Sequence, residues 1–205
     1  MICGHVIFAF STNNELFSVF DPILYKKFRF SALVENEQNG GRGEHVPIAQ
    51  FAMFVAEELV HCCNIDIGNA ITVVSNNLSV ASAWMYNLFV LELIKAYDCN
   101  TRNRSLIDLA HAISNTIYNY NNCTIFYLNL VQIKLRIGVI EPKEIENLKR
   151  MLYAEDDNVI RCGIHLLLGD SMSFYQTFGL LPKTKQDEMK SWPIYKLAEP
   201  FTHIA

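Results

Sequence analysis

Two copies of one short pattern decide the predicted fold: VQIKLRIG at residues 131–138 and CGIHLLLG at residues 162–169. The second copy lies 31 residues after the first (162 against 131), and the alignment places identical isoleucine, leucine and glycine residues opposite one another. A glycine after an apolar run is typical of a helix end. A helix, a glycine stop and a returning helix at a period near 34 residues is typical of stacked helical hairpins. The pattern therefore predicts an all-α fold of stacked hairpins.

A resemblance to a known family follows from these residues. The run YLNLVQIKLRIG (127–138) resembles one helix of a tetratricopeptide-like (TPR-like) repeat, LLLGD (166–170) resembles the end of the next, and WPIY (192–195) resembles the close of such a stack. Similar repeats occur in bacterial regulatory and defence proteins. The resemblance covers roughly residues 120–196. It implies an α-solenoid and, through it, a binding role, and it implies no active site.

Capping signals predict the helices of the C-terminal third. We expect one from about Thr124 to Gly138, one from Glu141-Pro142 to about Tyr153, and one from Asp157 to Gly169. A short helix is expected from Ser171 to about Gly179. Thr184 and Asp187 match a capping box for a last helix, which Pro193 would close.

Upstream of residue 120 the helix signals are looser. Helices are expected near residues 12–20, 22–38, 48–62, 69–74, 79–97 and 103–118, with a glycine-rich loop at 40–43. We therefore predict an N-terminal helical region, 1–120, that forms a helical bundle or continues the stack, and a TPR-like region, 121–205. A single continuous domain remains the alternative.

Composition narrows the class of protein. The chain is 51% hydrophobic and 19% charged, with a net charge of -4, so nucleic-acid binding is not favoured. Six cysteines without CxxC spacing indicate free thiols in a reducing compartment, which predicts a cytoplasmic protein. The longest apolar run, residues 80–94, is interrupted by polar residues and is too short for a membrane span.

One residue pair could carry chemistry. Arg104 and His111 form an Arg-x6-His pattern at the start of a predicted helix, about two turns apart on one face. The pattern resembles the Arg-x4–6-His motif of small α-helical ribonucleases, the HEPN group. The resemblance implies that the histidine acts as acid or base and that the arginine stabilises a charged phosphate. An arginine at a helix start and a half-buried histidine are the structural alternative.

Metal and cofactor sites are less well supported. Glu58-x-x-His61 and Asp108-x-x-His111 share the carboxylate–histidine spacing of di-iron bundles, and Glu35 or Glu92 would have to supply further ligands. Because Glu58 falls near the end of its helix and Asp108 near the start of its own, we expect no metal. No GxxxxGK[ST] or GxGxxG motif occurs, so no cofactor is expected. Cys162 and His165 lie on a leucine-rich helix, which favours a packed core.

The sequence therefore predicts a non-catalytic helical-repeat module that binds a protein or peptide, with self-association left open. The alternative is a HEPN-like ribonuclease that uses Arg104 and His111.

Overall fold

The computed structural model describes residues 67–76, 78–99 and 103–201, and these residues are almost entirely helical and contain no β-strand. This confirms the predicted all-α class for that part of the chain. The chain divides into two compact units, Met1–Asn122 and Cys123–Ala205. The helices predicted between residues 12 and 62 lie outside the described residues.

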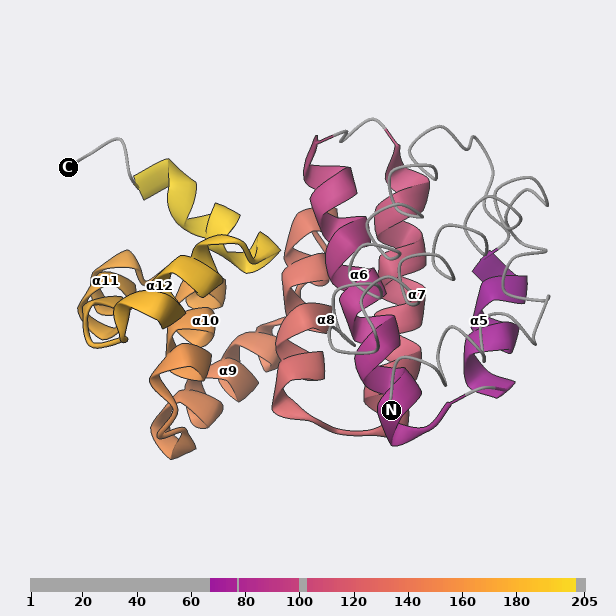
Figure 1. Cartoon of the computed structure of the whole chain (residues 1–205), viewed down its shortest axis with the longest axis horizontal. Helices are drawn as coiled ribbons and strands as arrows, with labels where there is room; N and C mark the ends of the chain where they lie inside the picture. The colour runs from indigo at the N-terminus through magenta and orange to yellow at the C-terminus, as the bar shows by residue number, and fades with distance from the viewer. Residues whose placement is uncertain (1–66, 77, 100–102, 202–205) are drawn as a thin grey trace, which may run out of the picture. The chain divides into compact units, whose positions relative to one another are not determined.

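The described part of the first unit consists of α5 (Ile67–Asn76), α6 (Val80–Cys99) and α7 (Arg104–Tyr120). α7 packs against both α6 and α5 (Figure 1). The buried face of α7 is apolar apart from Ser114, and its leucines and isoleucines recur at helical spacing. The helix predicted at residues 69–74 is confirmed, since α5 spans Ile67–Asn76. Tertiary packing here outweighs the β preference of its branched residues.

The second unit is built around α10. Its elements are α8 (Thr124–Ile137), α9 (Pro142–Ala154), α10 (Asn158–Leu168), α11 (Ser171–Gly179), α12 (Lys183–Lys190) and the 3₁₀ helix η1 (Pro193–Phe201). α10 packs against α8, α9, α11 and η1, and its contact with α11 is the most extensive. α8 and α9 pack little against each other. The α10–α11 pair is therefore a packed hairpin, whereas α8 and α9 each pack against α10 and hardly against each other.

The two glycines of the repeated pattern end their helices in the same way. Gly138 has φ 73° and Gly169 has φ 70°, both in the left-handed region. At the end of α8, Gly138 N–H donates to Leu135 O (3.2 Å) and Val139 N–H to Lys134 O (3.0 Å). At the end of α10, Gly169 N–H donates to Leu166 O (3.2 Å) and Asp170 N–H to His165 O (2.9 Å). Both ends are Schellman motifs, as the glycines predicted.

The starts of α9 and α10 follow the predicted chemistry, and the start of α12 does not. Glu141 and Glu144 form a reciprocal capping box at α9, and the Asp157 side chain accepts from Val159 N–H at α10. The capping box predicted at Thr184 is wrong, because the N-cap of α12 is Pro182, two residues earlier. α12 ends at Lys190 with Ser191 as its C-cap, and Pro193 follows two residues later as the first residue of η1.

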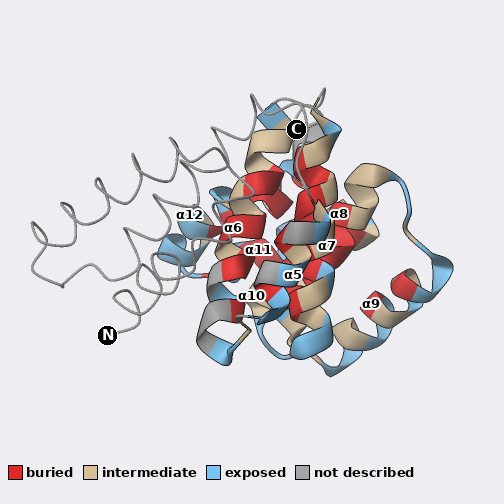
Figure 2. Cartoon of the chain, turned by 90° about the vertical axis from the view of Figure 1, so that its right-hand side faces the viewer, coloured by how far each residue is buried: buried red, intermediate tan, exposed pale blue. Residues whose placement is uncertain are grey.

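The core of the second unit lies along α10. Six consecutive residues of α10, from Cys162 to Leu167, are buried, and Leu148 of α9 and Phe174 of α11 are fully buried. By contrast, α9 is mostly half-buried or exposed, as its tan and pale blue ribbon shows (Figure 2). None of the helices in the described part of the chain has both the length and the apolar character needed to cross a bilayer.

Candidate functional site

The candidate site is the outer face of α11, which we define as Met172, Tyr175, Gln176, Gly179 and the C-cap residue Leu180. α11 begins where the Asp170 side chain accepts a hydrogen bond from Ser173 N–H at 3.1 Å. No residue of the helix itself is charged.

The inner face of α11 fixes its orientation. Phe174 is fully buried, and Phe178 and Leu181 are also buried. The rings of Phe174 and Phe178 lie 5.2 Å apart, and each contacts the ring of Tyr195 in η1. Because this face is held in the core, the opposite face must point away from it.

The outer face is open and, apart from Gln176, apolar. The exposed fraction is 75% for Met172, 40% for Tyr175 and 72% for Leu180. The Tyr175 ring packs edge-on against Phe174, with centroids 5.1 Å apart, so it is held in place while exposed. A Cβ added at Gly179 would meet no atom within 4 Å, so the backbone there is uncovered. The Tyr175 ring therefore presents apolar area at a low cost in side-chain ordering.

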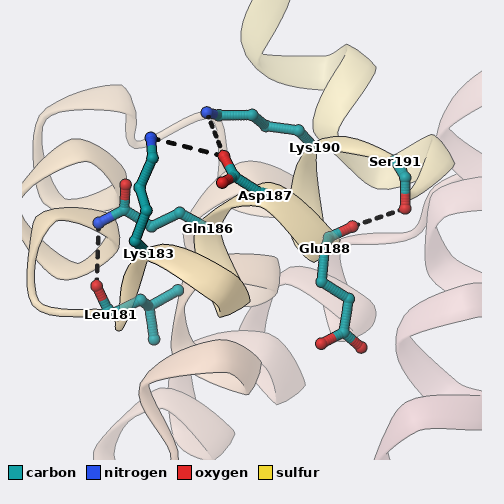
Figure 3. A network of polar contacts seen from close by, with 7 residues as sticks. All are labelled: Leu181, Lys183, Gln186, Asp187, Glu188, Lys190 and Ser191. Carbon is teal, nitrogen blue, oxygen red and sulfur yellow. Dashed lines mark hydrogen bonds and ion pairs between the residues drawn. The ribbon is translucent and has the colours of Figure 1, made fainter.

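The neighbouring helix α12 carries charges that are paired within the helix (Figure 3). Lys183 and Lys190 both contact Asp187 Oδ1, at 3.5 and 3.0 Å, and Lys185 contacts Glu188 at 2.7 Å. The Gln186 side chain donates to Leu181 O at 2.9 Å, which ties the start of α12 to the end of the α11 segment.

The electrostatics of α12 follow from these pairs. The hydrogen bond from Lys190 lowers the pKa of Asp187, and the same contact raises the pKa of Lys190. Both groups are therefore charged at neutral pH. Lys183 and Lys190 share the one carboxylate of Asp187, so α12, with three lysines against one aspartate and one glutamate, keeps a net charge of +1.

The structure places Arg104 and His111, the pair of the ribonuclease hypothesis, on α7. Arg104 is the first residue of the helix and is exposed, and its Nε lies 3.5 Å from Asp108 Oδ1. His111 is half-buried and follows seven residues later, which is a rise of about 10 Å along the axis. The structure thus brings Arg104 together with Asp108, and the catalytic role of Arg104 and His111 stays a prediction.

The other chemical candidates are settled by burial or lie outside the described residues. Burial raises the pKa of the Cys162 thiol to about 12, so it is not a thiolate nucleophile at neutral pH. Glu35, Glu58 and His61 lie outside the described residues, and Glu92 pairs with Lys95 at 2.7 Å. Within residues 67–76, 78–99 and 103–201, no three histidine, cysteine, aspartate or glutamate side chains gather into a group that could hold a metal ion.

His165 is a buried titratable group beside the candidate site. Its Nδ1 lies 3.6 Å from Asp170 Oδ2, across the turn between α10 and α11. Burial lowers the pKa of His165, and the nearby Asp170 carboxylate opposes this only in part. The imidazole is therefore neutral at physiological pH and serves as a packed side chain.

The outer face of α11 was not predicted from the sequence. A signal was present: Met172, Tyr175 and Leu180 are apolar in addition to the core residues Phe174 and Phe178, so the helix is apolar on both sides. Compared with known proteins, the chain matches no family model, no curated protein and no solved structure.

Proposed function

We propose that the chain is a non-catalytic protein-interaction module of TPR-like helical hairpins, which binds a protein partner through the outer face of α11. The partner would present a complementary apolar and uncharged face. We expect the module to work in the cytoplasm.

The observation that carries this proposal is the exposure of Met172 and Leu180 on a helix whose inner face is already buried. Exposed apolar residues that are contiguous on one face mark interaction surfaces more often than isolated ones do. Methionine and tyrosine are enriched at protein interfaces. Because α11 has no charged residue, burial of apolar area would drive binding, and added salt should not weaken it.

The repeat hypothesis is supported by the matched ends of α8 and α10. Besides their Schellman motifs, the two helices carry Lys134 and His165 at equivalent positions, and each side chain lies beside a carboxylate of the returning segment. Lys134 pairs with Glu144, and His165 lies near Asp170. The loose contact between α8 and α9 is the point at which the second unit departs from a regular hairpin stack.

The proposal is tested by isolating the tagged chain gently and quantifying the proteins that accompany it by mass spectrometry. Three forms are compared: wild type, the outer-face variant Met172→Ser/Leu180→Ser, and the control Tyr153→Ser. Tyr153 is a matched control because it is 92% exposed on α9. We expect a stoichiometric partner with wild type and with the control, and its loss with the outer-face variant. Equal recovery with all three forms contradicts the proposal.

The ribonuclease hypothesis makes a different prediction. Arg104 would have to leave Asp108, because the carboxylate repels a phosphate that the guanidinium is meant to bind. RNA cleavage that is lost in His111→Ala, while the helical circular dichroism is unchanged, would establish that activity and displace binding as the main function.

A further inference from the structure

η1 is an unusual element, because it is a 3₁₀ helix of nine residues, and 3₁₀ runs longer than three or four residues are uncommon. Its hydrogen bonds, such as the 3.0 Å bond from Tyr195 N–H to Trp192 O at its start, have poorer geometry than those of an α-helix. The segment therefore depends on contacts with the surrounding helices for its place.

The first contact is made by a backbone carbonyl. Arg136 of α8 donates from Nη2 to Pro193 O at 2.9 Å. The same guanidinium is held on α8 by Gln132, to whose carbonyl oxygen Nη1 donates at 3.1 Å. Gln132 is itself buried and donates to Asn129 Oδ1 at 2.6 Å. α8 thus holds the donor in position independently of η1.

The second contact is made by an aliphatic side chain. Ile194 is buried, and its Cδ1 lies 3.5 Å from the position that a Cβ on Gly163 would occupy. Leu128 Cδ1 lies 3.6 Å from the same position. Because Gly163 has no side chain, Ile194 packs closely over the backbone of α10, next to Leu128.

The third contact is made by an aromatic ring. The Tyr195 centroid lies 6.0 Å from that of Phe174 and 5.8 Å from that of Phe178, both on the inner face of α11. Tyr195 is only half-buried, whereas Phe174 is completely covered. Phe174 and Phe178 would therefore offer the same aromatic surface to a ring from a partner segment in place of Tyr195.

Three consecutive residues of η1 thus meet three different features on three helices: a fixed donor, a slot over a glycine and a pair of rings. Recognition of short peptide segments can combine main-chain hydrogen bonds with pockets for particular side chains. We propose that these features of α8, α10 and α11 form a peptide-binding surface that η1 occupies in cis. A partner segment in which a branched aliphatic residue is followed by an aromatic residue would replace it, with the carbonyl of the preceding residue accepting from Arg136.

This inference goes beyond the proposed function, because it uses the inner side of α11 and leaves the outer face free. The probe is a fluorescent synthetic peptide of residues 191–201, SWPIYKLAEPF, whose binding to the full chain is measured by anisotropy. The wild-type chain should bind it weakly, since the cis segment competes at an effective concentration on the order of mM.

Two substitutions in the chain should change peptide binding in opposite directions. Ile194→Ala weakens the cis segment and should strengthen peptide binding at least tenfold. Adding Arg136→Ala removes the carbonyl donor and should reverse most of that gain. A peptide carrying Ile194→Asp should not bind either form. The outer-face variant Met172→Ser/Leu180→Ser should bind the peptide as wild type does, so a failure of one proposal is distinguishable from a failure of the other.

The proposal is overturned if Ile194→Ala binds the peptide no more tightly than wild type does while retaining its helical circular dichroism. It is equally overturned if the peptide carrying Ile194→Asp binds as tightly as the unmodified peptide. The same holds if Arg136→Ala, added to the Ile194→Ala chain, leaves peptide binding unchanged. Should Ile194→Ala lose its helical signal, Tyr195→Ala at the half-buried position takes its place with the same expected gain and the same contrary result.

Discussion

The two faces of α11 carry similar side chains in opposite surroundings. Phe174 and Phe178 on the inner face are buried against the core of the second unit, whereas Met172 and Leu180 on the outer face are largely exposed. Apolar composition alone therefore does not decide the role of a position on this helix. The inner face packs against η1 and the core of the second unit, and the outer face is left uncovered.

The largest expected effect is on the inner face. Phe174→Ala removes a fully buried ring that contacts Phe178 and Tyr195, so it should lower the free energy of unfolding by about 3–5 kcal/mol. Chemical denaturation of wild type and variant measures this. A loss below about 1 kcal/mol would mean that the inner face is not part of the core and would remove the contrast between the faces.

A smaller loss of stability is expected at Gly169, the left-handed residue between α10 and α11. Gly169→Ala places a side chain at φ 70° and should cost about 1–2 kcal/mol. Gly138→Ala at φ 73° should cost the same, because a Cβ at either glycine meets no atom within 4 Å. Thermal or urea unfolding of both variants tests the equivalence. A clear cost at only one glycine argues against a repeated helix end.

The pH dependence of the free energy of unfolding should include a contribution from His165, which lies near Asp170 at the start of α11. Burial lowers its pKa below the ordinary 6.5, so the unfolded chain takes up a proton at a higher pH than the folded chain does. The stability that the folded chain gains from keeping His165 neutral is complete above about pH 6.5. It is lost as the pH falls toward the pKa of His165 in the folded chain. The loss in stability between about pH 7 and 5 should be smaller in His165→Gln. Parallel curves for the two proteins would show that His165 is not buried as a neutral group.

The smallest effect is expected on the outer face. Met172→Ser/Leu180→Ser should change the free energy of unfolding by no more than about 0.5 kcal/mol, because neither side chain is buried. The same denaturation experiment provides the measurement. A cost comparable to that of Phe174→Ala would show that the outer face packs within the chain and is no surface for a partner.

Local chemistry explains why helix ends were predictable. Gly138 and Gly169 adopt the left-handed conformation that their positions indicated, and Asp157 caps α10 as expected. These features involve only a few neighbouring residues, so the sequence contains all the information that they need. The prediction at Thr184 was wrong because Pro182, two residues earlier, is the N-cap of α12.

Tertiary packing explains what was not predictable. Nothing near Pro193 indicates a 3₁₀ helix, because η1 owes its place to Arg136, Gly163 and Phe174, which lie far away in sequence. The outer face of α11 was missed because the sequence does not show which of two apolar faces is covered. Arg104 and His111 do share a helix, as predicted, but their spacing alone defines no reaction.

The most direct test of the account is site-specific photo-crosslinking in native cells. A photoreactive amino acid is placed at position 172 on the outer face of α11 or, as a control, at position 153 on α9. We predict a discrete crosslinked partner from position 172 that is absent from position 153 and that resists added salt. The same products from both positions, or none from position 172, would contradict the claim that the outer face of α11 binds a protein.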